Sequence, residues 1–487
     1  MTLLMCFLPS TNLFSQKLDY INLSESANGM RFLEIQGHYG NGFINAASNQ
    51  PFSAADQSKF YKKKEIMVDF IGEQLNLQYA LSLPHQPCDF LYDLIVVNDQ
   101  LHYLTGNENK RGDSLFLLLH TWQDGTKKFI SSIIDTIPLN SQYVYTYPHF
   151  SKSNDEGWFT YFYTTIDRQD DALNLFFNTS ESESIQWHKQ KIATKTIEKE
   201  FILEQFIVAN NGTIALLAMQ LLNGKKIKTA TDAQHLLYVA PYKNGYHRAT
   251  IRDEKHFLNT AGLQIDLLNN KTIVAGYYAD ESSYSAAGVF IFTMDSMYQG
   301  NTKYVKFDNS FLATINSNRL TKRSDELIDY KIDKLIVRRD GGVVLIAENY
   351  KETITNSFDF FSQTYITNYV YYYGSIMLLN INPDGKFLWS HVINKDQQSQ
   401  NDNGYLSSYA TFLGKNAIKL MFNRNISSAG NIAYVDIDIK GNKKVTAMNL
   451  NKEEIYLVPT GALQLNEDEI AMPILKENKL MLVKITY

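Results

Sequence analysis

The chain has 487 residues, of which 44% are hydrophobic and 20% charged, and its formal net charge is -5 at pH 7. Proteins that bind nucleic acids usually carry an excess of positive charge to hold the phosphate backbone, and this chain has none, which argues against a nucleic-acid partner. Its 31 Tyr and 28 Phe favour strands, so the composition points to β structure.

Residues 1–15 form a predicted secretory signal peptide. Residues 3–8 are a short apolar run, and residues 13–16 offer a cleavage site at Ser15. The basic n-region of such a peptide is missing, which a truncated start would explain. The alternative to a signal peptide is that these residues form a buried first strand. No later stretch approaches the ~18 apolar residues of a membrane span. We therefore expect residues 16–487 to form a single domain with no transmembrane segment.

A four-strand unit recurs along the chain and is clearest in the sixth copy. There, residues 332–337 and 343–348 form two strands, and residues 375–380 and 387–392 form two more. Gly-rich turns join each pair, and Asp384-Gly385 suits a tight hairpin. The second strand of the unit begins near eight positions: Gly42, Leu101, Gly157, Gly212, Lys271, Gly341, Lys415 and Asp468.

Four strands per unit, repeated at this spacing, predict an all-β fold, a β-propeller of about eight four-stranded blades. Seven blades is the alternative number, and a β-sandwich pair or an open array is the alternative architecture. The last unit lacks a fourth strand, whereas residues 18–23 form a spare one before the first unit. We expect this N-terminal strand to complete the last blade, which leaves no sheet edge bare.

The longest insertion, residues 350–374, separates the second and third strands of the sixth unit and is rich in aromatic residues. Such loops emerge on one face of a propeller, and aromatic side chains are enriched at interface hot spots. We predict a loop that binds a protein partner through Phe358, Phe360, Phe361, Tyr365, Tyr369, Tyr371 and Tyr373. The alternative is that residues 369–373 extend the third strand and pack inside their own blade.

No motif in the sequence marks an enzyme or a metal site. The ten histidines are scattered without metal-binding spacing, and no G-x-S-x-G sequence occurs. We therefore expect no catalytic residue, no metal and no cofactor, and we interpret the chain as a protein-binding scaffold. The alternative is a carbohydrate-binding or glycoside-cleaving propeller, which would use channel carboxylates such as Asp93, Glu204, Asp266 and Asp333.

Residues 340–348 and 382–389 carry the patterns D-G-G-apolar and N-P-D-G-x-x-x-W. This blade resembles exported β-propeller repeats of bacteria with type 9 secretion, and the Phe14-Ser15-Gln16 signal end is similar to theirs. The resemblance implies a location in the periplasm or cell envelope. Cargo of that system usually ends in a sorting domain, but here the last strands are needed for the last blade. The resemblance therefore implies a periplasmic partner of an outer-membrane translocon, such as a plug-type component of the type 9 system.

Overall fold

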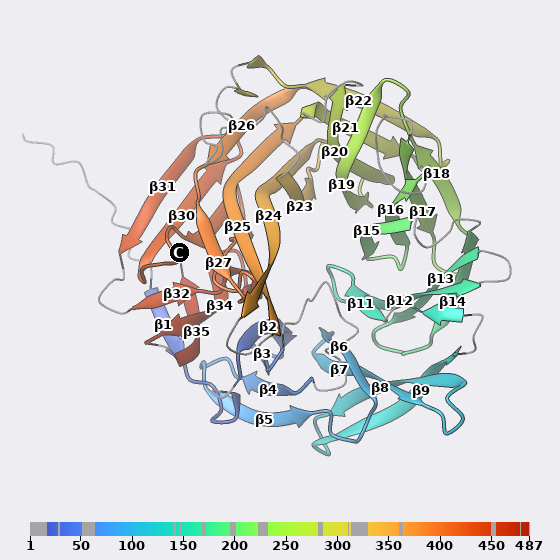
Figure 1. Cartoon of the computed structure of the whole chain (residues 1–487), viewed down its shortest axis with the longest axis vertical. Helices are drawn as coiled ribbons and strands as arrows, with labels where there is room; N and C mark the ends of the chain where they lie inside the picture. Colours follow the sequence, from blue (N-terminus) through green and yellow to red (C-terminus); the bar gives the residue numbers. More distant parts are fainter. Residues whose placement is uncertain are drawn as a thin grey trace, which may run out of the picture.

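The computed structural model describes residues 17–27, 30–50, 64–139, 143–145, 148–167, 172–194, 201–222, 232–280, 286–309, 311–312, 330–359, 364–449, 454–477 and 479–486. Within these ranges the chain forms eight antiparallel sheets that surround a central axis as the blades of a β-propeller (Figure 1). The predicted fold and the number of eight blades are confirmed. The predicted signal peptide lies outside the described residues. No helix in the described ranges has the length and hydrophobicity to cross a membrane.

In each blade the strands follow one another from the axis outward. Blade 1 has β2 (Phe32–Tyr39), β3 (Gly42–Ser48), β4 (Ile66–Ile71) and β5 (Leu77–Leu83). Blade 2 has β6 (Phe90–Val97), β7 (Gln100–Glu108), β8 (Ser114–Gln123) and β9 (Lys128–Pro138). In blade 3, β10 (Tyr143–Tyr145) and β11 (His149–Lys152) both pair with β12 (Trp158–Asp167), and β13 (Ala172–Glu181) and β14 (His188–Thr194) follow. Blade 4 has β15 (Phe201–Val208), β16 (Ile214–Leu221), β17 (Ala233–Ala240) and β18 (His247–Ile251).

The second half of the ring repeats this order. Blade 5 has β19 (His256–Asp266), β20 (Lys271–Asp280), β21 (Ala286–Met294) and β22 (Gly300–Lys306). Blade 6 has β23 (Tyr330–Val337), β24 (Val343–Asp359), β25 (Thr364–Ile381) and β26 (Phe387–Ile393), with β27 (Gln397–Gln400) added to β25. Blade 7 has β28 (Ala410–Gly414), β29 (Ala417–Asn423), β30 (Asn431–Asp438) and β31 (Lys443–Asn449). In blade 8, β32 (Ile455–Leu457) and β33 (Leu463–Gln464) pair with β34 (Glu469–Lys476), which pairs with β35 (Lys479–Thr486).

The central strands of the blades are apolar because neighbouring blades cover both of their faces. β16 is buried over its first six residues, whereas most of the outer strand β9 is exposed. The core therefore lies between blades. Ile44 and Val68 of blade 1, for example, pack with Leu94 and Tyr103 of blade 2. Burial of each such side chain contributes roughly 1.5–3 kcal/mol, so packing between blades holds the ring together.

β1 (Lys17–Ile21) closes the ring as the outermost strand of blade 8. It pairs antiparallel with β35, so that Lys17 lies opposite Thr486 and Ile21 lies opposite Leu482. The predicted closure by the N-terminal strand is confirmed, although the strand spans 17–21 rather than 18–23. This pairing gives β35 a partner on both sides, β34 and β1, and makes β1 the outer edge of the blade.

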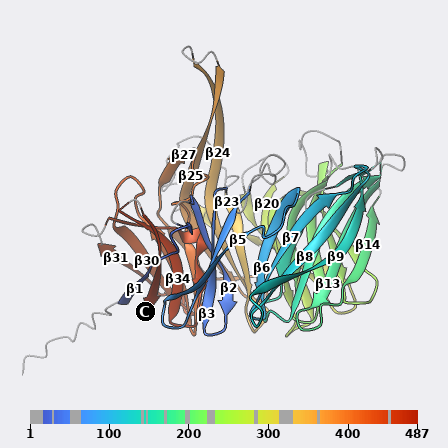
Figure 2. The same cartoon turned by 90° about the horizontal axis from the view of Figure 1, so that it is seen from below.

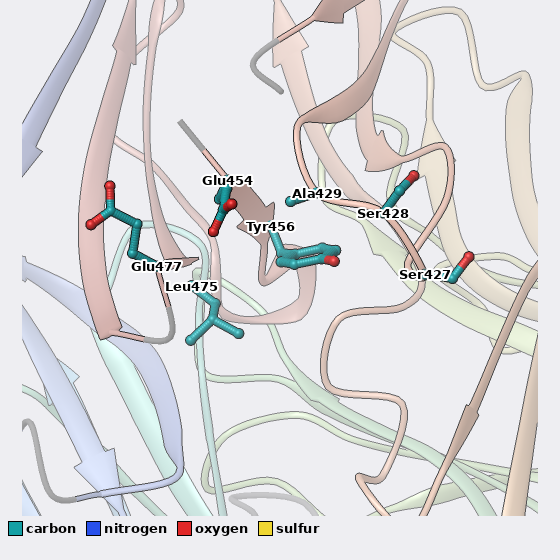
Figure 3. Close-up of a pocket in the computed structure, with 7 residues that line it drawn as sticks. All are labelled: Ser427, Ser428, Ala429, Glu454, Tyr456, Leu475 and Glu477. Atoms are coloured by element: carbon teal, nitrogen blue, oxygen red, sulfur yellow. The ribbon is translucent and has the colours of Figure 1, made fainter. Parts of the chain in front are cut away.

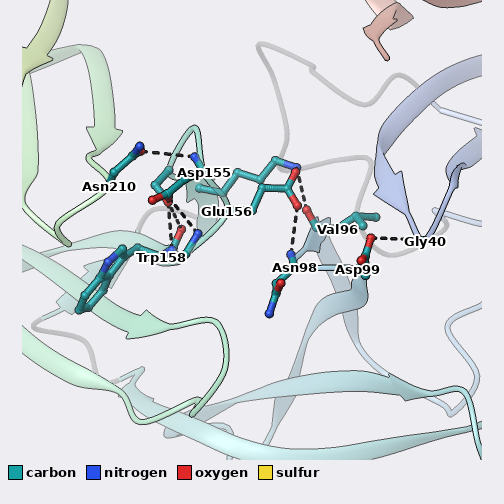
Figure 4. Close-up of polar contacts among 11 residues, drawn as sticks. Gly40, Val96, Asn98, Asp99, Asp155, Glu156, Trp158 and Asn210 are labelled. Carbon is teal, nitrogen blue, oxygen red and sulfur yellow. Dashed lines mark hydrogen bonds and ion pairs between the residues drawn. The ribbon is translucent and has the colours of Figure 1, made fainter. Parts of the chain in front are cut away.

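On one face of the ring, the turns between first and second strands are bonded to one another (Figure 4). Three backbone amides donate to side chains of the next blade: Gly40 to Asp99 Oδ1 at 2.8 Å, Asn98 to Glu156 Oε2 at 3.0 Å, and Asp155 to Asn210 Oδ1 at 3.4 Å. Blades 1 to 4 are therefore linked at this face by polar contacts as well as by apolar packing. The opposite face carries the blade 6 insertion (Figure 2).

Candidate functional site

The insertion in blade 6 forms a long β-hairpin that rises well above its face of the ring (Figure 2). β24 and β25 continue past the body of the blade and stay paired from Tyr350 opposite Tyr373 to Asp359 opposite Thr364. A register shift between Glu348 and Tyr350 marks where the hairpin leaves the blade. The predicted loop is a β-hairpin in the described residues, so the alternative in which residues 369–373 extend the third strand is correct as to the strand, although Tyr369 is 39% exposed and not packed inside the blade. Residues 351–359 contain no Gly or Pro, so nothing in their chemistry interrupts a strand.

In the described part of the hairpin, most aromatic positions lie on one face. Directly opposed residues of an antiparallel pair share a face, and alternate residues of a strand share it too. The register therefore defines one row, here called the aromatic row: Tyr350, Glu352, Ile354 and Asn356 of β24 with Tyr373, Tyr371, Tyr369 and Thr367 of β25. Backbone positions 358 and 365 continue this row. Five of the seven predicted contact residues thus belong to one row, and Phe360 and Phe361 lie outside the described residues.

A segment that follows blade 6, residues 397–409, covers the lower part of the aromatic row, and we call it the strap. Its strand β27 pairs with β25, with Gln397 opposite Tyr373 and Gln400 opposite Val370. The Tyr371 hydroxyl donates to Asn403 Oδ1 at 2.9 Å, and Tyr371 is only 6% exposed. Tyr371 and Tyr373 therefore pack within the protein rather than facing solvent.

Above the strap, Ile354 and Tyr369 of the aromatic row are open to solvent. Ile354 and Tyr369 lie opposite each other across the hairpin and are 58% and 39% exposed. The Tyr369 backbone is nevertheless fixed, because its N–H donates to Asn401 Oδ1 and its carbonyl accepts from the Asn401 N–H, both at 2.9 Å. The structure thus presents two large apolar side chains on a held backbone. We call Ile354 and Tyr369, with the exposed pair Asn356 and Thr367 above them, the upper face of the hairpin.

The strap is tied to blade 1. The Tyr405 hydroxyl accepts a hydrogen bond of 2.8 Å from the Leu33 N–H of β2, and its ring packs edge-on against Phe32. Burial raises the pKa of the Tyr405 hydroxyl, which keeps it neutral. At the other end of the strap, the Tyr409 hydroxyl donates to Asp333 Oδ2 of β23 at 2.7 Å. The hairpin of blade 6 is therefore held against blade 1 as well as against its own blade.

The four channel carboxylates singled out in the sequence lie on the innermost strands of four different blades. Each has its own partner: Asp93 Oδ2 accepts from Phe150 N–H at 3.0 Å, Glu204 Oε2 lies 2.7 Å from His235 Nδ1, Asp266 Oδ1 accepts from Asn269 N–H at 3.1 Å, and Asp333 binds Tyr409. None of these contacts joins two of the four carboxylates. Among the described residues, no group of three or more His, Cys, Asp and Glu side chains is placed to hold a metal ion.

Glu34 on β2 is an ionisable group that the sequence did not single out. Burial and the nearby Asp93 raise the pKa of Glu34 to about 7, and Lys64 acts in the opposite direction. Desolvation also lowers the pKa of Lys64. No local pattern could have found this group, because Glu34 and Asp93 come from different blades. Ile354 was also missed, although the β-branched run Thr353-Ile354-Thr355 favours a strand and could have pointed to it.

A polar pocket of about 390 Å³ lies between blades 7 and 8 (Figure 3). Its lining includes the hydroxyls of Ser427 and Ser428 and the carboxylates of Glu454 and Glu477, with the Tyr456 ring between them. Glu454 and Glu477 lie on exposed turns, so their carboxylates stay in contact with solvent. Nothing in this lining selects a ligand, so the hairpin is the stronger candidate site.

No known family model matches the chain, and no curated protein matches it. Among solved structures, the WD40 domain of SCAP from fission yeast is similar at 8% identity and a TM-score of 0.40, over 97% of this chain and 98% of that one. The β-propeller domain of the trilobed protease from Pyrococcus furiosus is similar at 8% identity and a TM-score of 0.35, over 86% and 94%. Prolyl oligopeptidase B from Galerina marginata matches at 8% identity and a TM-score of 0.41, over 92% of this chain and 56% of that one. Likeness at this level carries no argument about function, and the eight sheets themselves identify the chain as a β-propeller.

Proposed function

We propose that this protein is a non-catalytic protein-binding scaffold and that the upper face of the blade 6 hairpin is its docking surface. The observation that carries the proposal is the exposure of Ile354 and Tyr369 on a backbone that Asn401 of the strap holds in place. Aromatic and large aliphatic side chains anchor protein interfaces. A backbone that is already held in place loses less entropy on binding, so a small interface can still bind its partner tightly.

Other exposed apolar side chains do not share these features. Ile130 and Ile133 on β9 are 61% and 62% exposed, but they belong to the outer strand of a blade. Single apolar residues on a protein surface are common and need no partner to explain them. The hairpin differs because it projects from the ring and because the strap supports it from its base up to Tyr369.

The test is a truncation that removes the upper face and keeps the strap. Thr353 and Val370 lie directly opposite each other, so residues 354–369 can be replaced by Asn-Gly, which suits a two-residue hairpin. Tyr371, Tyr373 and β27 then retain their contacts. A tagged intact protein and the truncated one are used as baits in native cell extracts. We expect a partner that the intact bait captures and the truncated bait does not, with Ile130→Glu as a control that captures it normally. The same captured proteins with both baits would contradict the proposal.

The location and the partner are part of the proposal. The signal-peptide features of residues 1–15 and the type 9-like patterns at residues 340–348 and 382–389 support an envelope protein. We propose that the scaffold acts in the periplasm beside an outer-membrane export complex. Cell fractionation and a pull-down from native membranes test this. Recovery of the free protein alone, or its presence only in the cytoplasm, would contradict the location and partner and leave the hairpin test unaffected.

A further inference from the structure

The two edges of the hairpin differ. The edge of β25 is covered from Val370 to Tyr373 by β27, and Asn401 continues this cover to Tyr369. The edge of β24 loses its partner where the hairpin leaves the blade, because pairing with β23 ends at Asn349. Within the described part of the chain, no strand pairs with β24 on this side between 350 and 359. Every second residue there turns its backbone N–H and C=O away from β25.

This open edge lacks the features that keep edges unpaired. Native proteins protect edge strands with proline, lysine or bulges. Residues 351–359 contain no proline, their single lysine is at the base, and the Thr353-Ile354-Thr355 sequence has high β-propensity. No register shift interrupts the pairing of β24 with β25 above Tyr350. The edge is therefore long and regular, and its outward N–H and C=O groups can form hydrogen bonds with another strand.

We propose that this edge pairs antiparallel with the same edge of a second copy, so that two hairpins form one four-stranded sheet in a two-fold dimer. The charges select the register. With the axis at Thr355, Lys351 lies opposite Asp359 of the second copy at both ends, and Thr353 lies opposite Ser357. No like charges are opposed. The pairing uses all nine residues from 351 to 359, a length of about 30 Å at roughly 3.4 Å per residue.

This register also keeps both aromatic rows on one face of the joined sheet, because opposed residues share a face. Ile354 of one copy then lies diagonal to Ile354 of the other, within reach of a contact. The hairpins project from the face of each ring, so the two rings would face each other (Figure 2). The inference goes beyond the proposed function, since it concerns the edge of the hairpin rather than its upper face, and it would place two docking surfaces side by side.

A cysteine at the proposed axis gives the most specific test. Thr355 is exposed, and in this register the two copies of position 355 face each other. We expect Thr355→Cys to form a disulfide-linked dimer under mild oxidation on a non-reducing gel. Thr367→Cys is the matched control, because position 367 is exposed too but lies on β25, one strand inward. Dimers from Thr367→Cys and none from Thr355→Cys would overturn the proposal.

A charge exchange tests the register without cysteines. By analytical ultracentrifugation, the intact chain should form dimers that Lys351→Glu weakens by about tenfold, since it places like charges opposite each other. Adding Asp359→Lys to Lys351→Glu should restore the dimer. A chain that stays monomeric up to roughly 100 µM, where a dimer with a Kd of about 10 µM would be mostly assembled, overturns the inference. A monomer that still captures its partner through the upper face overturns the dimer alone and leaves the proposed function standing.

Discussion

Lys395 Nζ and Glu348 Oε1 form an ion pair of 2.5 Å in which the two side chains are 0% and 4% exposed. Glu348 is on β24 just before the hairpin leaves the blade, and Lys395 precedes the strap. Lys395 also donates to Tyr373 O at 3.2 Å, and Glu348 Oε2 accepts from Ser408 Oγ at 2.6 Å. The pair therefore joins the base of the hairpin to both ends of the strap that supports it.

Lys395→Met should strongly destabilise the protein, because it leaves the Glu348 carboxylate buried without its cation. Loss of one partner of a buried ion pair typically lowers the free energy of unfolding by about 3–5 kcal/mol. Urea unfolding followed by tryptophan fluorescence measures the change. Lys484→Met is the control, since its pair with Glu469 is partly exposed and should contribute no more than about 1 kcal/mol. Equal effects of the two substitutions would contradict the role given to Lys395.

Ile21→Asp should open the ring at its closing strand. Ile21 is 1% exposed and packs with Leu33, Ala471 and Leu482, so a carboxylate there would be buried without a partner. We expect a loss of about 3 kcal/mol or more in the free energy of unfolding, measured by thermal or urea denaturation. Asn22→Asp introduces the same residue at the exposed neighbouring position and should change stability little. A stable Ile21→Asp protein would show that β1 does not close the ring.

Gly441→Ala should destabilise the contact between blades 6 and 7. Gly441 has a φ of 85°, and a Cβ there would lie 2.5 Å from the Trp389 ring. The strained backbone and the clash together should lower the free energy of unfolding by about 1–3 kcal/mol. The matched variant is Gly245→Ala, where a Cβ meets no atom within 4 Å and stability should stay within about 0.5 kcal/mol. Similar losses at both glycines would rule out this explanation.

Glu34 should make the stability depend on pH. Burial raises its pKa from the usual 4.5 to about 7, so the folded state binds more protons than the unfolded state between these pH values. Stability therefore falls as the pH rises through this window. Glu34→Gln removes this titration. The free energy of unfolding of the variant minus that of the intact protein should therefore rise by about 1–3 kcal/mol from pH 4.5 to pH 8. Urea unfolding at both pH values measures this, and a difference that does not change with pH would contradict the assignment.

The sequence predicted the strands well because the repeat is a local signal. β3 begins at Gly42 and β20 at Lys271, the predicted positions, and β24 begins only two residues after Gly341 at Val343. The hairpin was interpreted as a loop because residues 350–374 are an insertion between the second and third strands of the repeat. Its strands are defined by long-range register, which composition does not report. The strap contact of Tyr405 with Leu33 joins positions 372 residues apart, so no local pattern could predict it.

Site-specific photo-crosslinking in native cells tests the central claim, that the upper face of the hairpin binds a partner protein, most directly. A photoreactive phenylalanine analogue is placed at Tyr369, and at Ile130 on β9 as an exposed control. We predict a covalent adduct from position 369 that contains a second, different protein, and none of that adduct from position 130. No adduct at position 369, or the same adducts from both positions, would contradict the claim.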